Sequence, residues 1–100
     1  MSGGWDAVAI HPDDDVAVAL RDVAAGETLR VRAGAALESL TALGAVPLGH
    51  KLARRDLAAG AVVRKYGAPI GATVAAVAAG AHVHVHNLVS LRARSPVAAR

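Results

Sequence analysis

Three histidines alternate with valines near the C-terminal end of the chain, in the segment Ala81-His82-Val83-His84-Val85-His86-Asn87. Successive side chains of a strand point to opposite faces, so a strand here would place the imidazoles on one face and the valines on the other. Two histidines at this spacing can bind a first-row divalent metal if further ligands come from elsewhere. One imidazole could instead act as a general acid or base. The plainer alternative is a polar strand face whose histidines cap loops.

The two lysines of the chain stand in glycine-containing, turn-like segments, Pro47-Leu48-Gly49-His50-Lys51 and Lys65-Tyr66-Gly67-Ala68-Pro69-Ile70-Gly71. The chain has eleven basic residues, of which these two are lysine and nine are arginine, and its single tyrosine is Tyr66. Where arginine is used so consistently, a retained lysine indicates a need for a compact ammonium group. Chance is the alternative, because two residues are a small sample.

Other acidic and basic side chains have more than one possible role. Asp13, Asp14 and Asp15 could offer oxygen ligands to Mg²⁺ or Ca²⁺, but the favoured interpretation is that they cap a turn before the next strand. Three arginines could attract a substrate carboxylate, although a solvated surface is the favoured role for each. These are Arg54, Arg55 and Arg64.

The net charge of +3 comes from the end of the chain. Residues 1–89 contain eight acids and eight Lys or Arg, so Arg92, Arg94 and Arg100 supply the whole excess. We expect residues 92–100 to form a flexible basic tail after a domain of residues 1–91. A nucleic-acid-binding protein would present a basic face with aromatic residues on its folded body, so we expect no nucleic-acid partner.

The folded body is itself polarised. Residues 1–45 carry seven acids against three arginines, for a net charge of −4, whereas residues 46–89 carry one acid against five basic residues, for +4. The second half therefore suits an anionic small molecule.

One hundred residues suffice for one small domain with a modest core. The hydrophobic fraction is 54%, but alanine supplies 25 residues and phenylalanine is absent. Such side chains pack in thin layers that leave little room for a large internal pocket, so we expect a site at an edge, completed by another chain. The absence of cysteine excludes disulfides, thiolate catalysis and sulfur-bound zinc. No membrane-spanning or secretory segment is recognisable, and we expect a cytoplasmic protein.

Short strand-like segments recur between glycines, at residues 7–10, 16–20, 29–31, 62–64 and 82–86. Residues 34–44 are compatible with a short helix or a loop, and residues 52–57 with a helical turn. We therefore predict a compact, mostly-β domain of short strands with one or two short helical turns.

An internal repeat accompanies these strands. Arg21-Asp22-Val23-Ala24-Ala25-Gly26 returns as Arg55-Asp56-Leu57-Ala58-Ala59-Gly60, and Val77-Ala78-Ala79-Gly80 is a partial third copy. Each copy predicts a tight turn, with an Asp that accepts bonds from nearby backbone N–H groups, one apolar anchor, and a Gly of positive φ. The unequal spacing excludes a solenoid and indicates a turn-then-strand unit reused within one β fold.

Four motifs in this order resemble one family. They are Ile10-His11-Pro12-Asp13-Asp14-Asp15-Val16-Ala17-Val18-Ala19-Leu20, Leu48-Gly49-His50-Lys51, Lys65-Tyr66-Gly67 with Ile70-Gly71, and His82-Val83-His84-Val85-His86-Asn87-Leu88. The pattern is similar to the small N-terminal region of the altronate and galactarate dehydratases, and the sulfolactate sulfo-lyase alpha subunit shares it. The resemblance covers about residues 6–91. The chain departs from many relatives at Asp15, where they have Asn, and at Leu52, where they have Phe.

The resemblance implies an antifreeze-like (SAF) β-clip fold and a lyase that removes water or sulfite from an acidic, polyol-like substrate. It also implies a divalent metal, Fe²⁺ with Mn²⁺ or Mg²⁺ as alternatives, shared with a large catalytic subunit. A homo-oligomer is a further option. The residues carried over as catalytic are His50, Lys51, Lys65, Tyr66, His84 and His86. His84 and His86 are the expected metal ligands or proton carriers, and Lys51, Lys65 and Asn87 the expected substrate-binding residues.

Elimination from a hydroxy acid needs a base at the carbon next to the carboxylate, a Lewis acid, and cations for the developing enediolate. The leading hypothesis is therefore a small lyase subunit that is inactive alone. Two alternatives stay open: a stand-alone sugar-acid or metal-binding module, and a structural or regulatory domain of a larger enzyme.

Overall fold

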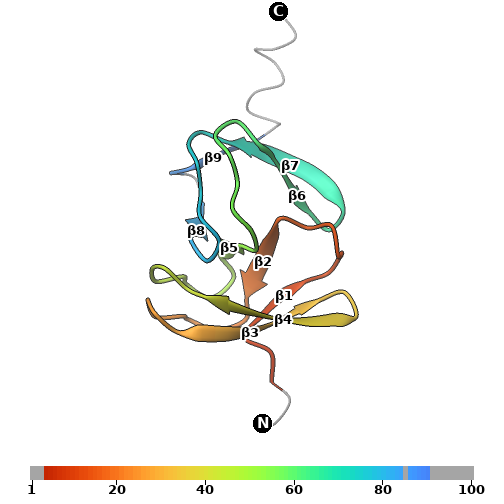
Figure 1. Cartoon of the computed structure of the whole chain (residues 1–100), viewed down its shortest axis with the longest axis vertical. Helices are drawn as coiled ribbons and strands as arrows, with labels where there is room; N and C mark the ends of the chain where they lie inside the picture. Colours follow the sequence, from red (N-terminus) through yellow and green to blue (C-terminus); the bar gives the residue numbers. More distant parts are fainter. Residues whose placement is uncertain (1–3, 85, 91–100) are drawn as a thin grey trace, which may run out of the picture.

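The computed structural model describes residues 4–84 and 86–90, which contain short β-strands joined by tight turns (Figure 1). The strands are β1 (Ala7–Ala9), β2 (Val16–Ala19), β3 (Thr28–Ala33), β4 (Ala36–Thr41), β5 (Lys51–Ala53), β6 (Val62–Lys65), β7 (Ala68–Thr73), β8 (His82–Val83) and β9 (Leu88–Ser90). The mostly-β prediction is confirmed. The predicted tail at residues 92–100 lies outside the described residues.

The strands form two sheets. One has six strands in the order β4-β3-β1-β2-β5-β8, and the other has three in the order β6-β7-β9. Only the β1–β3 pair among the described pairings is parallel, with Ala7 opposite Val31. In Figure 1 the three-stranded sheet lies above the six-stranded one, and β5 and β8 lie on the side of the larger sheet that is nearer to it. The site described below lies where these two sheets meet.

The predicted helical turns are wrong. Residues 36–41 form β4, which pairs with β3 along its whole length from Thr28–Thr41 to Ala33–Ala36. Residues 51–53 form β5, which is hydrogen-bonded to β2 on one side and to β8 on the other. In both cases a neighbouring strand satisfies the backbone groups, and this pairing overrides the local helix preference of Ala, Leu and Glu. No helix occurs in the described parts of the chain, and hence none that could cross a membrane.

The repeat forms the turns that the sequence predicts. Gly26, Gly60 and Gly80 have φ of 88°, 78° and 88°, a region that glycine enters without strain. A fourth turn of this kind ends at Gly49 with φ 84°, in the segment where the sequence predicts a turn but shows no copy of the repeat. Their apolar anchors meet in pairs across the molecule, Val23 with Val46 and Leu57 with Val77.

The aspartates of the repeat bind distant turns rather than nearby backbone. Asp22 Oδ1 accepts from the N–H of Leu48 at 2.8 Å, and Asp56 Oδ1 accepts from the N–H of Ala79 at 2.9 Å. Each full copy of the repeat thus stabilises a second turn more than twenty residues away. In this way the repeat places the chain just before His50 and just before His82.

Two apolar clusters of small aliphatic residues form the core. One lies in the six-stranded sheet around Leu29, Val31 and Leu52, and the other joins the sheets through residues such as Val16 and Val63. Alanine and glycine let backbones approach closely, since a β-carbon at Gly80 would lie 1.9 Å from the carbonyl oxygen of Thr41. The core is thin, as the composition predicts.

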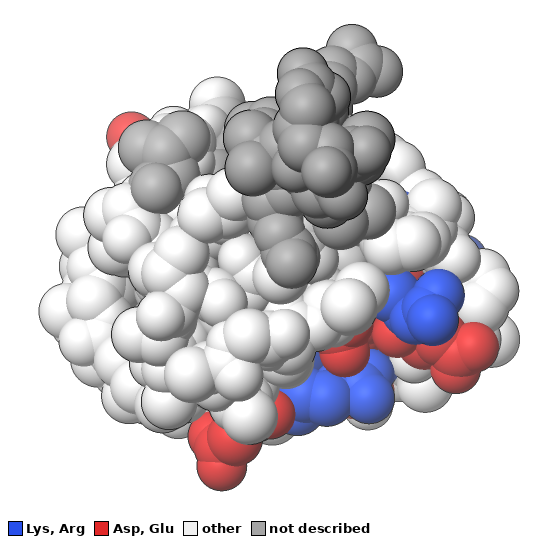
Figure 2. Space-filling model, turned by 90° about the horizontal axis from the view of Figure 1, so that it is seen from above, with Lys and Arg blue, Asp and Glu red and all other residues white. Residues whose placement is uncertain are grey.

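Formal charge is unevenly distributed over the fold. Residues 66–90 contain no Asp, Glu, Lys or Arg. Viewed from above, the described surface is mostly uncharged, with basic and acidic side chains side by side at one edge (Figure 2).

We predict that Gly80→Ala destabilises the domain far more than Gly60→Ala. Both glycines have positive φ, which costs an alanine about 1–2 kcal/mol. At Gly80 the added β-carbon would also collide with Thr41, whereas at Gly60 nothing lies within 4 Å. Denaturant unfolding should show a loss of about 2–5 kcal/mol for Gly80→Ala and only the conformational cost for Gly60→Ala. Equal losses would contradict the close approach.

Candidate functional site

Three imidazoles from distant parts of the chain meet beside β5 and β8. His50 Nδ1 lies 2.9 Å from His82 Nε2, and the His50 ring stacks on that of His84 with centroids 4.2 Å apart. One ligand atom from each of the three rings can be chosen so that all lie within 4.8 Å of one another. We call His50, His82 and His84 the histidine cluster. Its donors are all imidazole nitrogens, which suit Fe²⁺, Zn²⁺ and similar ions better than Mg²⁺.

Local structure explains how His50 reaches this cluster. The turn ending at Gly49 is closed by the N–H of His50, which donates to the carbonyl of Pro47. The chain then enters β5, whose Leu52 lies opposite His82 in the β5–β8 pair. His50 therefore emerges next to His82 although 32 residues separate them.

The predicted strand at residues 82–86 is only partly right, because β8 ends at Val83. His84 lies in a bend and His86 in a turn, yet each ring still lies close to the ring of His82. His86 is exposed, and its ring lies 5.3 Å from that of His82 at a tilt of 44°. Sequence reasoning chose His84 and His86 as the metal pair, whereas the structure groups His84 with His50 and His82. The alternation of histidines was the signal for His82.

Asn87 holds this bend with both ends of its amide. Its Oδ1 accepts from the N–H of His84 at 2.9 Å, and its Nδ2 donates to the carbonyl of His82 at 2.8 Å. Its own N–H donates to the carbonyl of His84. The sequence predicts Asn87 as a substrate-binding residue, and its hydrogen bonds in the structure position two of the clustered histidines.

Partial desolvation lowers the pKa of His82, and neighbouring His50, His84, His86 and Lys51 lower it further. The pKa of His84 is lowered in the same way, by desolvation and then by His50, Lys51 and His86. Both rings therefore lose their proton at a lower pH than a free imidazole does, and a neutral imidazole has the lone pair that a metal requires.

A cleft of about 340 Å³ adjoins the cluster where the two sheets meet. It is lined by Lys51, Lys65, Ile70, His84, Leu88 and Ser90. Lys51 comes from β5 of one sheet and Lys65 from β6 of the other, and no carboxylate is among the lining residues. Burial and the nearby Lys65 both lower the pKa of Lys51. The arrangement suits an anion, and His84 belongs to both the cleft and the histidine cluster.

Tyr66 stands beside the cleft in an uncommon backbone conformation. With Gly67 it forms the two-residue turn between β6 and β7, and both residues have positive φ, of 55° and 77°. This turn type favours Asn or Gly at the first position, and a tyrosine there is strained. The Lys65 ammonium lies 4.6 Å from the centroid of the Tyr66 ring, within range of a cation–π interaction.

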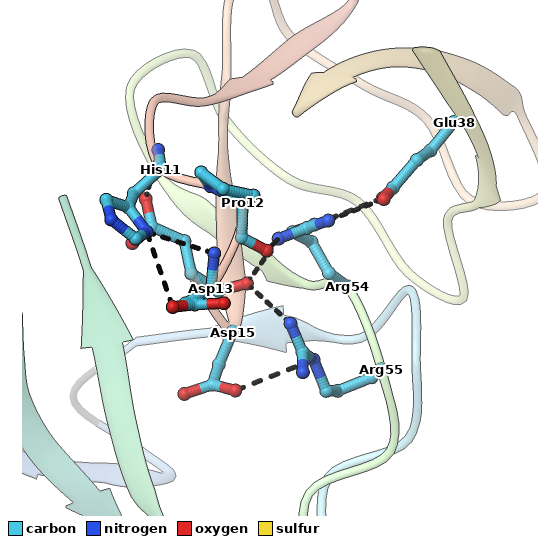
Figure 3. A network of polar contacts seen from close by, with 8 residues as sticks. His11, Pro12, Asp13, Asp15, Glu38, Arg54 and Arg55 are labelled. Atoms are coloured by element: carbon cyan, nitrogen blue, oxygen red, sulfur yellow. Dashed lines mark hydrogen bonds and ion pairs between the residues drawn. The ribbon is translucent and has the colours of Figure 1, made fainter. Parts of the chain in front are cut away.

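The acidic segment before β2 is structural, which confirms the turn-capping interpretation (Figure 3). Asp14 is 1% exposed and accepts from the backbone N–H groups of His11, Tyr66 and Gly67. Burial alone would raise the pKa of this carboxyl, but these three N–H groups together lower it. The negative charge is thus held where metal binding would break existing bonds.

The three arginines also have structural contacts. Arg54 was expected at a solvated surface, but its side chain is only 7% exposed and pairs with Glu38 (Figure 3). Arg55 Nε lies 3.5 Å from Asp15 Oδ1, and the backbone of Arg64 exchanges hydrogen bonds with Asp15. Arg54 and Arg55 flank the junction of the sheets without lining the cleft.

Most of the chain is similar in sequence to known proteins. Residues 5–91 match the family model described as the altronate/galactarate dehydratase SAF domain. The chain is 48% identical over 80 residues to the altronate dehydratase of Escherichia coli K12, a match that spans 80% of this chain and 15% of that protein. It is 52% identical over 48 residues to the (2R)-sulfolactate sulfo-lyase subunit alpha of Chromohalobacter salexigens, which spans 48% of this chain and 51% of that subunit.

A second alpha subunit, from Paracoccus pantotrophus, is 45% identical over 53 residues, or 53% of this chain and 79% of the subunit. The matched region is therefore a small part of the dehydratase and half or more of each alpha subunit. Most of the dehydratase lies outside it.

We predict that Asn87→Ala weakens Co²⁺ binding to the histidine cluster about 10- to 100-fold, the usual cost of removing a residue that orients metal ligands. The substitution removes both side-chain bonds that hold His82 and His84. Visible absorption of bound Co²⁺ measures the affinity. Thr28→Ala, on the exposed β3–β4 hairpin, is the control and should bind as the unsubstituted chain does. Equal affinities for all three proteins would show that Asn87 does not orient the cluster.

Anion binding in the cleft should weaken as the pH rises. The loss should begin at a lower pH than it would if Lys51 had the pKa of an ordinary lysine. The pKa of Lys51 lies below its usual value of 10.5, so the ammonium loses its proton early and its attraction for an anion with it. Sulfate titrations followed by NMR between pH 7 and 10 measure this. Lys51→Arg keeps its charge over this range and should flatten the dependence. A wild-type affinity that stays constant would contradict the assignment.

Proposed function

Since the chain belongs to the altronate/galactarate dehydratase SAF domain family, we propose that it is the small subunit of a two-subunit lyase. The reaction is a β-elimination of water or sulfite from a sugar acid or a related hydroxy acid. The observation that carries the proposal is that His84 belongs to two sites at once. It lines the cleft that contains Lys51 and Lys65, and it is part of the histidine cluster. Such a substrate has a carboxylate and an adjacent oxygen for these two subsites.

Lys51 and Lys65 are the groups that hold the substrate carboxylate. They approach the cleft from different sheets, so an anion between them contacts two ammonium groups at once. Removal of the neighbouring proton moves negative charge onto the carboxylate oxygens, and preorganised cations stabilise that charge. Tyr66 supports Lys65 through its ring face.

The histidine cluster is the metal subsite. Three imidazole nitrogens fit Fe²⁺, the metal we propose, whereas Mg²⁺ prefers oxygen ligands. A metal held by His50, His82 and His84 would supply a Lewis acid for a substrate oxygen. Asn87 keeps two of these rings in place.

His86 is the proton-transfer residue in this proposal. It is exposed, it lies beside His82, and it is outside the group of three clustered rings. Histidine is the side chain used most often as a general base. In this proposal it accepts the proton from the carbon next to the bound carboxylate.

A large catalytic subunit is the proposed partner. The cleft is shallow and open at the junction of two small sheets, and the family's dehydratases are far longer than the matched region. The partner would cover the cleft, exclude water and add the remaining ligands. We expect the isolated chain to be inactive and the complex to act in the cytoplasm.

Reconstitution tests the proposal. The tagged chain is co-purified with the product of a neighbouring gene for the large subunit, and the complex is assayed against altronate, galactarate and sulfolactate. Elimination that needs both chains is the expected result. Binding of a sugar acid or metal by the chain alone, without a partner or turnover, would support a stand-alone binding module instead.

In the active complex, His86→Ala should lower kcat about 10²- to 10⁴-fold, the usual contribution of a general base, without changing metal content. His84→Ala should lose bound metal as well as activity. Stopped-time product assays and metal analysis separate the two effects, with Thr28→Ala as the control that keeps activity. If both histidine variants turn over at the wild-type rate, the assigned roles are wrong.

A further inference from the structure

The buried Asp14 carboxylate is bound entirely to backbone, and two of its partners are far away in sequence. Its Oδ2 accepts from the N–H of Tyr66 at 2.8 Å, and its Oδ1 accepts from the N–H of Gly67 at 2.7 Å. A third bond comes from the N–H of His11 at 3.2 Å. Each of the two N–H groups of the β6–β7 turn thus binds its own carboxylate oxygen, and together these bonds fix the position and the orientation of the turn.

This contact explains how a tyrosine adopts a left-handed conformation. Both N–H groups of the turn converge on one carboxylate, and charge-assisted bonds of this kind are about twice as strong as neutral ones. They can therefore offset the strain at Tyr66, whose φ is 55°. The Tyr66 ring then lies where it meets the ammonium of Lys65, 4.6 Å from its centroid.

The other side of Asp14 is anchored to the sheet that carries Lys51. Its carbonyl oxygen accepts from Arg54 Nη1 and Arg55 Nη2, two residues that directly follow β5 (Figure 3). Arg54 also donates to the carbonyl of Pro12 and to Glu38 of β4. Asp14 thus connects the end of the Lys51 strand to the turn that follows Lys65.

We propose that Asp14 is a positioning residue for the anion cleft, acting through the Tyr66–Gly67 turn and the Tyr66 ring to hold the Lys65 ammonium opposite Lys51. The inference rests on the proposed function only in that it treats the cleft as an anion site. Asp14 does not touch the anion itself, because its oxygens face the backbone.

Asp14→Asn tests this, because it keeps the shape of the side chain but replaces one acceptor oxygen by a donor. Two NMR measurements on the full chain apply: the upfield ring-current shift of the Lys65 ε-methylene protons, and the affinity for inorganic sulfate. We expect the variant to lose the ring-current shift and to bind sulfate at least threefold more weakly, while its Co²⁺ affinity at the histidine cluster stays unchanged. If Asp14 only stabilised the fold, the substitution would weaken sulfate binding and Co²⁺ binding together.

Asp6→Asn is the matched control. Asp6 also accepts from a backbone N–H, that of Arg30 at 2.8 Å, but it lies just before β1, and neither residue lines the cleft. It should leave both the Lys65 shift and sulfate binding as in the wild type. A shift and affinity that survive in Asp14→Asn, or a wild type that shows neither, would overturn the proposal.

Tyr66→Asn provides a second test if Asp14→Asn does not fold. Asparagine accepts positive φ readily, so the turn and its bonds to Asp14 persist and the melting temperature should not fall. Sulfate affinity should nonetheless drop at least threefold, because the ring beside Lys65 is gone. Unchanged affinity would show that the turn does not act through this ring.

These outcomes are separable from those of the lyase proposal. If sulfate binding depends on Asp14 but the complex catalyses no elimination, the lyase proposal is wrong and the positioning role of Asp14 stands. If the complex is active and Asp14→Asn changes neither its KM nor its kcat, the lyase proposal stands and the positioning role of Asp14 is wrong.

Discussion

The relative placement of the two sheets is the constraint on which the site depends, because Lys51 and Lys65 stand on different sheets. The apolar cluster around Val16 and Val63 brings the sheets together, but apolar contact is not directional and does not set their orientation. Hydrogen bonds do so. The Asp14 carboxylate, with its fixed geometry toward the β6–β7 turn, and the arginines on its carbonyl join one sheet to the other.

The composition of the core determines where a site can form. Alanine and glycine allow close backbone approaches, as at Gly80 against Thr41, and at Gly71, where a β-carbon would lie 2.4 Å from the carbonyl oxygen of Val89. Layers this close leave no room for a substrate within a sheet. The cleft lies instead at the junction between the sheets, where Lys51 of one sheet and Lys65 of the other line it.

Charged side chains of the two halves of the chain have different roles, in ion pairs in the first half and in the cleft in the second. Acids of the first half are largely occupied: Asp6 and Glu27 bind Arg21, and Glu38 binds Arg54. The two lysines of the second half face a cleft with no carboxylate in its lining. The opposite net charges of the two halves therefore have different causes. The acids stabilise turns and strands, and the lysines are left available for an anion.

The sequence by itself determined five of the strands at least in part, the glycine turns and the residue types of the site, because alternation, positive-φ glycines and rare lysines are local signals. It also pointed to His84, Lys51 and Lys65. It could not determine that residues 36–41 pair as an edge strand, since their local preference is helical. Nor could it place His50 against His82, or Asp14 under Tyr66, which are 32 and 52 residues apart. Only the tertiary structure decided these contacts, because they depend on how two sheets pack, and no local pattern encodes a distance between sheets.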